Sequence, residues 1–326
     1  MQMLLAVLCG LGLFLLGLKL MSLGLEALWS TAFAAALHRY TQNRFSAFLC
    51  GLLFTALTQS SSLATVLVVG IVDAGLMSLP AAISVIIGAN VGTTLTGQLI
   101  SFQLIQYALP LAALGFLLFA IGKGKYRQAG KALMGLGILL FGLRIMGEAL
   151  IPLSTKAWFS KVLQIAGIHP FWGIVAGALT TAVIQSSSAV IGVTITMAQK
   201  GMVDLSGGIA IMLGADVGTC VTALVASLGS KLSARQAAVA HLLFNLFSLC
   251  FVLPIFPFFA SLAAASAASV PRQLANAHTF YNLTGAVVIL LWLTPFQRLT
   301  ETLLKADYSQ KRRIFFLFSE VIRKWF

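Results

Sequence analysis

Two runs of Gln-Ser-Ser-Ser lie inside apolar stretches of this chain, at residues 59–62 and 185–188. Three consecutive serines cannot share one face of a helix, because successive helical side chains are rotated by about 100°, so each run suits a helix break. There, serine hydroxyls and the free N–H groups of the next helix would cluster as donors for an oxyanion. Serines that only bond back to a carbonyl or allow close packing are the alternative. The predicted anion-binding residues are Gln59, Ser60, Ser61, Ser62, Gln185, Ser186, Ser187 and Ser188.

A second polar motif follows each serine run, Gly-Ala-Asn-Val-Gly-Thr-Thr at 88–94 and Gly-Ala-Asp-Val-Gly-Thr-Cys at 214–220. Glycines beside a polar residue let a helix unwind, and unwound backbone in a membrane is tolerated only where it lines a cavity or is buried in protein. We therefore expect an unwound transmembrane helix at each motif, with close packing of two small-residue helices as the alternative. Oxygen atoms there are hard ligands of the kind that sodium accepts. The predicted sodium ligands are Asn90, Thr93, Thr94, Thr96, Asp216, Thr219 and Thr222.

Asp216 carries the only charge in these two motifs, and its counterpart in the first motif is the neutral Asn90. An ionised carboxylate inside a bilayer costs several kcal/mol unless it is paired or hydrated, so we expect a cation beside it. Two pairs of His and Asn are each spaced four residues apart, which places each pair on one helical face; a helix–helix contact is favoured for them over a proton relay. These pairs are His241 with Asn245 and His278 with Asn282.

The composition indicates that this chain lies in a lipid bilayer. With 59% apolar and 9% charged residues and a mean hydropathy of +0.98, its apolar runs reach the roughly 20 residues that cross a membrane. It is therefore predicted to be an all-α integral membrane protein. The net charge of +13 lies in loops and the tail, where positive-inside topology explains it, so no nucleic acid partner is expected. The four cysteines lack metal-like spacing, and no cofactor is expected besides sodium ions as coupling ions.

Nine apolar runs can be distinguished, and two of them, 46–75 and 170–200, are interrupted near the middle by the serine runs. As a helix, the arm 46–58 would be about 20 Å long, which is short of a hydrocarbon core about 30 Å thick. Each interrupted run is therefore predicted to be a re-entrant helical hairpin with the serines at its tip. The full spans are expected at 3–28, 79–101, 104–122, 132–151, 205–228, 236–259 and 277–297.

The distribution of Lys and Arg near span ends favours the hairpins. With hairpins, nine such residues share one side and four the other, whereas the split is seven against six if both runs cross. Positive-inside bias then predicts a multi-pass protein of the plasma (inner) membrane, with the N-terminus outside and the C-terminus cytoplasmic. The nine are Arg39, Arg44, Lys123, Lys125, Arg127, Lys131, Lys231, Arg235 and Arg298, and the four are Lys156, Lys161, Lys200 and Arg272.

The chain contains an internal duplication. The two serine runs, and likewise Asn90 and Asp216, are 126 residues apart, and segment 10–21 resembles segment 135–146. With hairpins, each unit crosses the membrane three times, so the second copy enters from the opposite face, as in inverted-repeat transporters with a site at the repeat interface. The predicted organisation is a first inverted repeat at 1–130, a second inverted repeat with trailing spans at 131–298, and a basic amphipathic cytoplasmic tail at 299–326.

These motifs resemble a known family. The paired serine runs, the glycine motifs after them and the later His-x-x-Phe-Asn at 241–245 are similar to the bacterial branch of the type II sodium/phosphate cotransporters, over roughly residues 5–298. The resemblance implies sodium-coupled movement of inorganic phosphate, with the serine tips holding phosphate and the Gln, Asn, Asp and Thr positions named above contributing sodium ligands. It also implies an elevator-like transporter, in which a core carrying both hairpins moves against a scaffold, often as a homodimer.

Other functions remain open at this point. Some bacterial relatives are thought to export phosphate, so the direction of transport is not assigned, and a sodium-coupled carrier or exporter of another small oxyanion or dicarboxylate is the main alternative. An anion channel is a second. An intramembrane serine hydrolase is a third, but no Gly-x-Ser-x-Gly elbow surrounds these serines, so no enzyme is predicted.

Overall fold

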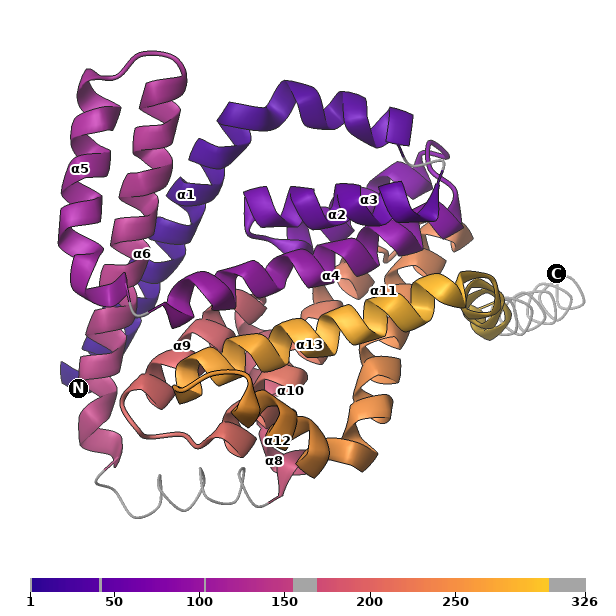
Figure 1. Cartoon of the computed structure of the whole chain (residues 1–326). Coiled ribbons are helices and arrows are strands. Elements are labelled where there is room, and N and C mark those ends of the chain that lie inside the picture. Colours follow the sequence, from indigo (N-terminus) through magenta and orange to yellow (C-terminus); the bar gives the residue numbers. More distant parts are fainter. Residues whose placement is uncertain (1, 41–42, 103, 155–168, 305–326) are drawn as a thin grey trace, which may run out of the picture.

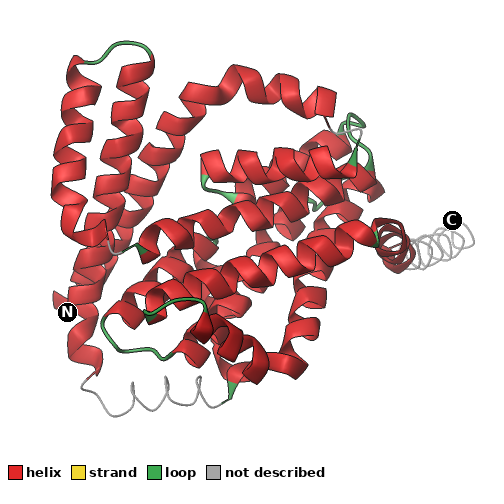
Figure 2. Cartoon of the chain, in the orientation of Figure 1, coloured by secondary structure: helices red, strands yellow, loops and turns green. Residues whose placement is uncertain are grey.

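The computed structural model describes residues 2–40, 43–102, 104–154 and 169–304, and every element in these ranges is a helix (Figure 1). The predicted all-α fold class is confirmed, and short loops join most of the helices (Figure 2). Most of the predicted tail at 299–326 lies outside the described residues. The helices are α1 (Gln2–Tyr40), α2 (Arg44–Thr58), α3 (Ser61–Asp73), α4 (Leu79–Ser101), η1 (Leu104–Tyr107), α5 (Ala108–Ile121), α6 (Lys125–Ser154), α8 (Pro170–Ile184), α9 (Ser187–Gln199), α10 (Leu205–Ala226), α11 (Leu232–Val252), η2 (Leu253–Ile255), α12 (Phe256–Ala265) and α13 (Val270–Leu291), followed by a helical stretch at 293–304.

Six segments of the described chain are long and apolar enough to cross a bilayer, which makes this a multi-pass membrane protein. The predicted span at 104–122 is wrong as a single helix, because a 3₁₀ turn precedes α5, whose 14 residues rise only about 21 Å. Pro110 explains the division, since it lacks an N–H and favours a helix that starts just before it. The six segments are 2–28, 79–101, 125–152, 205–226, 232–265 and 270–291.

Each serine run separates two helices, and the lengths match between the two copies. α2 and α8 have 15 residues each, and α3 and α9 have 13 each. α4 runs parallel to α2, because Gly51 lies against Val85 and Gly92 against Ala56. Since only residues 74–78 join α3 to α4, α3 returns toward the side where α2 began. Corresponding contacts relate α8 and α10, so each serine run lies at the tip of a helical hairpin.

The unwinding predicted at the two glycine motifs is wrong, because α4 and α10 are continuous helices through them. The glycines instead allow another backbone to approach. A Cβ added to Gly88 would lie 1.9 Å from the carbonyl oxygen of Phe48, and one added to Gly214 would lie 2.0 Å from that of Ile174. No side chain fits at such distances, so α2 lies directly on α4 and α8 on α10. Close packing of small-residue helices, the alternative considered above, accounts for these glycines.

Helices α1 and α6, which contain the repeated segments, lie side by side in opposite directions. A Cβ on Gly10 would meet Gly142, and one on Gly17 would meet Gly135. Residue numbers therefore increase along α1 in the direction in which they decrease along α6. α5 packs against α6, and these two helices stand upright at the left of Figure 1, with the first part of α1 beside α6.

The helices with the glycine motifs lie at the centre of the remaining helices. Nearly every residue of α4 is buried, and both α4 and α10 contact the second hairpin arms α3 and α9 and the later helices α11 and α13. The second arm of each hairpin therefore also packs on the motif helix of the other copy. This arrangement directs the polar residues of α4 and α10 toward a shared interior.

Candidate functional site

The two hairpin tips have the same backbone geometry. Gln59 and Gln185 end α2 and α8 in the left-handed conformation, with φ, ψ of 55°, 26° and 58°, 27°. No other non-glycine residue in the described ranges has a positive φ, and a left-handed residue is a common way to end a helix. The following Ser60 and Ser186 are extended, and each hydroxyl caps the next helix by accepting from the backbone N–H three residues on, at 3.2 Å.

The serines after the caps keep their donors free. The hydroxyls of Ser61, Ser62, Ser187 and Ser188 make no hydrogen bond with another described residue, although Ser61 and Ser187 are only 5% exposed. The first N–H groups of α3 and α9 also lack partners within their helices, as at any helix start. Each tip thus presents hydroxyl and backbone donors at the positive end of a helix dipole, which is an arrangement suited to an oxyanion.

The side chains of the two tip glutamines differ. Gln59 is 4% exposed, accepts a hydrogen bond at Oε1 from the Thr96 hydroxyl at 2.6 Å, and donates through Nε2 to the Ala56 carbonyl. Gln185 is exposed, and Thr222, the counterpart of Thr96, donates to Thr219 of its own helix at 2.7 Å. The first tip is therefore fastened to α4, whereas no side-chain hydrogen bond between described residues fastens the second tip to α10.

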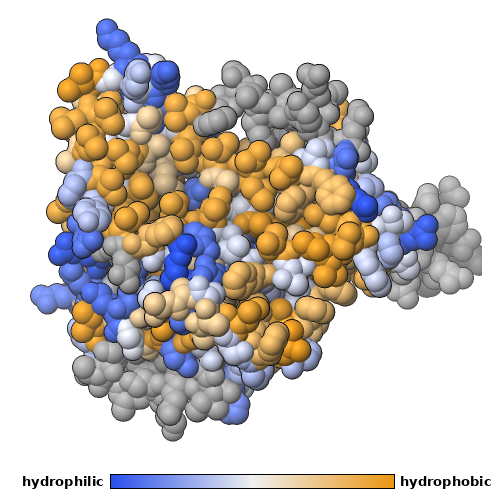
Figure 3. Space-filling view, viewed as in Figure 1, coloured by the Kyte–Doolittle hydropathy of each residue, from blue (hydrophilic) through white to orange (hydrophobic). Residues whose placement is uncertain are grey.

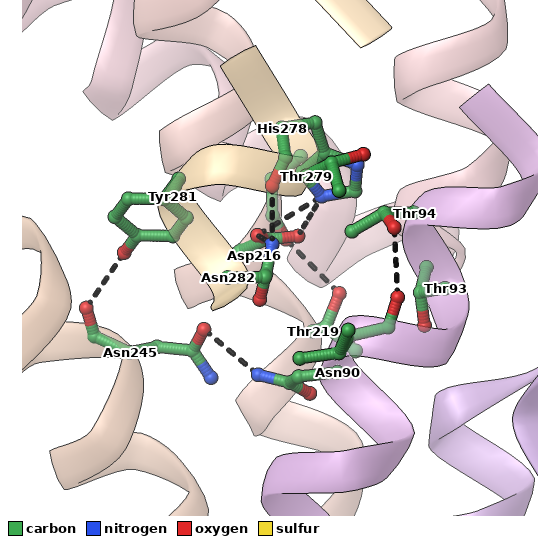
Figure 4. Close-up of polar contacts among 12 residues, drawn as sticks. Asn90, Thr93, Thr94, Asp216, Thr219, Asn245, His278, Thr279, Tyr281 and Asn282 are labelled. Atoms are coloured by element: carbon green, nitrogen blue, oxygen red, sulfur yellow. Dashed lines mark hydrogen bonds and ion pairs between the residues drawn. The ribbon is translucent and has the colours of Figure 1, made fainter. Parts of the chain in front are cut away.

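Both polar atoms of the Asn90 side chain on α4 form a hydrogen bond with α11. Its Nδ2 donates to Asn245 Oδ1 at 3.0 Å, and its Oδ1 accepts from His241 Nε2 at 3.0 Å. Figure 4 shows Asn90 and Asn245 facing each other across the two helices. The predicted helix–helix contact of this His and Asn pair is present, and its partner is the polar residue of the first glycine motif.

Asp216 on α10 makes the equivalent contacts with α13. His278 Nε2 lies 3.1 Å from both carboxylate oxygens, and Asn282 Nδ2 donates to Oδ2 at 2.8 Å (Figure 4). Asp216 is 6% exposed, so its charge is held by a buried imidazole and an amide. The partners of this carboxylate among the described residues are therefore the imidazole of His278 and the amide of Asn282.

The contacts of the His and Asn pairs with the glycine motifs were not predicted from the sequence. A signal for this was present, because the pattern Arg-Gln-x-Ala-x-Ala-His-x-x-aromatic-Asn occurs at 235–245 and again at 272–282. The repeat predicts that α11 and α13 have equivalent roles. In the structure each of these helices contacts one polar motif residue: α11 contacts Asn90, and α13 contacts Asp216.

The remaining predicted sodium ligands are threonines that donate to carbonyls of their own helices. Thr93, Thr94 and Thr219 bond back at 2.8–3.1 Å. Donation leaves the oxygen lone pairs of a hydroxyl available to a cation. Of the predicted residues, the structure joins Gln59 to Thr96 directly, and no hydrogen bond among the described residues joins Asn90 to Asp216 or one serine tip to the other.

Among the proteins with similar sequences, some are named as phosphate export or phosphate transport proteins. The uncharacterized protein YqeW of Bacillus subtilis is 29% identical over 90% of this chain and 95% of its own length. The putative inorganic phosphate export protein YjbB of Escherichia coli is 26% identical over 94% of this chain, which spans 57% of that relative. The sodium-dependent phosphate transport protein 2A of Ovis aries is 29% identical over 37% of this chain and 21% of its own length. No solved structure is detectably similar.

A sequence profile described as Na+/Pi-cotransporter matches residues 13–148 and again 148–267. The two matches cover most of the chain, and each includes one serine hairpin and one glycine motif. The same profile thus recognises both copies of the duplicated motifs. The chain belongs to the Na+/Pi-cotransporter family.

Proposed function

We propose that this protein is a secondary active transporter that couples sodium ions to the movement of inorganic phosphate across the membrane. The observation that carries the proposal is the pair of serine tips, each with free hydroxyls and a helix N-terminus. Family membership and the phosphate transport named for two relatives support the choice of phosphate. Phosphate binds between Ser60–Ser62 and Ser186–Ser188, with the two glutamines at the edge of the site.

The proposed architecture is a pair of inverted repeats. The antiparallel packing of α1 on α6, which contain copies of one segment, supports opposite orientations of the two units. In this arrangement the two tips approach a common site from opposite faces of the membrane. The group α1, α5 and α6 is the scaffold, and the hairpins with α4, α10, α11 and α13 are the transport core of an elevator-like protein that assembles as a homodimer.

Sodium lowers the electrical cost of the transport step. Phosphate near neutral pH carries one to two negative charges, and each charge moved against 100 mV costs about 2.3 kcal/mol. Two sodium ions would neutralise a divalent phosphate. Because α4 and α10 do not unwind, the proposed ligands are side-chain oxygens: those of the threonines, Asn90 and Asp216, with Thr96 positioned to couple a bound ion to the tip at Gln59.

The main alternative is a sodium-coupled carrier or exporter of another small oxyanion or dicarboxylate, since hydroxyl clusters at helix ends suit many anions. The direction of net transport follows from the gradients, and the name of the E. coli relative favours a test of export as well as uptake. The proposed location is the inner membrane, with the N-terminus outside and the C-terminus in the cytoplasm.

The decisive experiment is radiolabelled phosphate flux in proteoliposomes with and without a sodium gradient. We expect sodium-dependent flux that is lost in Ser61→Ala, Ser187→Ala and Asp216→Asn, with succinate and sulfate as weak competitors. Ser261→Ala is the control, because this exposed serine on α12 bonds only to its own helix and its loss leaves flux unchanged. Flux that is indifferent to sodium would refute the coupling, and stronger competition by succinate than by unlabelled phosphate would refute the substrate.

A further inference from the structure

Arg272, near the start of α13, is a half-buried cation with no carboxylate within ion-pair distance among the described residues. Its Nη1 donates to the Ser101 hydroxyl at 3.1 Å and to the Gln98 carbonyl at 3.4 Å, and its Cζ lies 4.0 Å from the centre of the Phe102 ring. All three partners belong to the end of α4. The last carbonyls of a helix favour a cation, so these contacts hold the guanidinium at the end of α4. Since none of these partners is a carboxylate, they do not neutralise its positive charge.

The position of Arg272 is fixed by contacts around it. The Gln98 amide lies within hydrogen-bonding distance of Ala275, Asn276 and Thr279, at 2.9–3.2 Å, and so ties α4 to the first turns of α13. Gln199, at the base of the second hairpin, donates to the carbonyl of Ile100 at 3.4 Å. The guanidinium therefore lies at a junction of α4, α9 and α13.

This junction is close to the first serine tip. Thr96, which fastens Gln59, precedes Ser101 by five residues, or about 7.5 Å along the helix axis. This axial rise between the two contact points on α4 is comparable to the Debye length at physiological ionic strength, about 8 Å, and charges interact more strongly near low-dielectric surroundings than in water. An anion at the first tip would therefore experience the field of Arg272.

The surface at this junction is polar. Figure 3 shows hydrophilic side chains gathered between α4 and the start of α13, within a face that is otherwise largely hydrophobic. The contacts above place Gln98, Arg272 and Asn276 in this region. A polar surface beside a helix end favours contact of this junction with water, and hence with a dissolved anion.

We propose that Arg272 is the residue that draws phosphate toward the serine tips from the membrane face at which α4 ends. This inference rests on the proposed function and deepens it, because it assigns to one residue the electrostatic part of phosphate affinity. Arg272 raises the local concentration of phosphate at the binding site and does not affect the movement of the phosphate-bound transport core. Its removal therefore raises the half-saturating phosphate concentration and spares the maximal rate.

Arg44 provides a matched control. Its Nη1 donates to the carbonyl of Leu290 at the end of α13 at 3.0 Å, and its guanidinium lies 5.1 Å from the centre of the Phe45 ring. Its guanidinium therefore has the same kinds of contact as that of Arg272, with the end of a helix and with an aromatic ring. It begins α2, however, and lies about 22 Å along that helix from the tip, which is beyond the reach of a screened charge.

The test is phosphate flux in proteoliposomes as a function of phosphate concentration and ionic strength, for the parent, Arg272→Gln, Arg272→Lys and Arg44→Gln. We expect Arg272→Gln to raise the half-saturating phosphate concentration about tenfold, as one unit charge at this distance implies, and to weaken the dependence on ionic strength. Arg272→Lys keeps the charge without the planar fork and stays near the parent, as does Arg44→Gln.

A purely structural role predicts a different pattern. If Arg272 only caps α4, Arg272→Lys and Arg272→Gln both lower the thermal stability and the maximal rate, with the same half-saturating concentration as the parent, and the inference is overturned. Should Arg272→Gln not fold, a parent-like ionic-strength dependence in Arg272→Lys supports the inference, and its loss overturns it. A parent that moves no phosphate at all overturns the proposed function, and this inference with it.

Discussion

Gln59 and Gln185 occupy the same position in two copies of one motif, yet only Gln59 is buried and bonded to the neighbouring motif helix. Their backbones are nearly identical, so the difference lies in the side chains alone. One tip is fastened and the other is free. A transporter whose two halves exchange roles would show such a difference within a single conformation.

The bond between Gln59 and Thr96 can be tested by its effect on stability. Thr96→Val leaves a buried amide oxygen without a donor, so we expect the free energy of unfolding to fall by about 1–3 kcal/mol. Thr222→Val, at the equivalent position, removes only a bond to its own helix, so a change below about 0.5 kcal/mol is expected. Thermal unfolding of the purified protein in detergent compares them, and equal midpoints would contradict the role of the bond.

At the residue scale, the sequence predicted which residues are polar and repeated but not their partners. The serine runs could be assigned to helix breaks, because three consecutive hydroxyl side chains do not fit one helical face. Asn90 and His241 are 151 residues apart, and a helical pattern shows that a face is polar without identifying what that face contacts. The repeated pattern around Arg235 and Arg272 would have indicated that α11 and α13 are equivalent.

At the element scale, the glycine motifs were misinterpreted because glycine has two uses inside a membrane. It permits unwinding, and it permits another backbone to approach. The local sequence is the same in both cases. The neighbouring helix decides between them. A Cβ added to Gly51 or Gly177 of the first hairpin arms would lie 1.9–2.0 Å from a carbonyl oxygen of the motif helix, and no single segment reveals this reciprocal contact.

A substitution in the second motif separates the two uses of glycine. Gly214→Ala places a Cβ 2.0 Å from a carbonyl oxygen of α8, so α8 and α10 must separate and we expect the unfolding free energy to fall by about 1–3 kcal/mol. Gly70→Ala on α3 is the control, because nothing lies within 4 Å of its added Cβ. Unfolding midpoints in detergent measure both. If Gly214→Ala is as stable as Gly70→Ala, the tight packing of α8 on α10 is wrong.

At the scale of the whole molecule, two groups of helices differ in what they carry. α1, α5 and α6 contain none of the predicted site residues, and α6 packs against both α1 and α5 through glycines and apolar side chains. The hairpins with the helices α4 and α10 carry all of them, and α11 and α13 contact α4 and α10. Composition and the two interrupted apolar runs were sufficient to predict a membrane protein with helical hairpins, whereas the contacts between the groups depend on tertiary packing that the sequence does not specify.

The central claim is that two duplicated serine tips bind one phosphate together, and equilibrium binding of radiolabelled phosphate to the purified protein in sodium tests it most directly. We predict one phosphate per chain, with Ser61→Ala and Ser187→Ala each weakening the affinity about tenfold or more, because a hydrogen bond to a charged group is worth about 1.5–3 kcal/mol. Two phosphates per chain, with each substitution removing only one of them, would contradict a shared site.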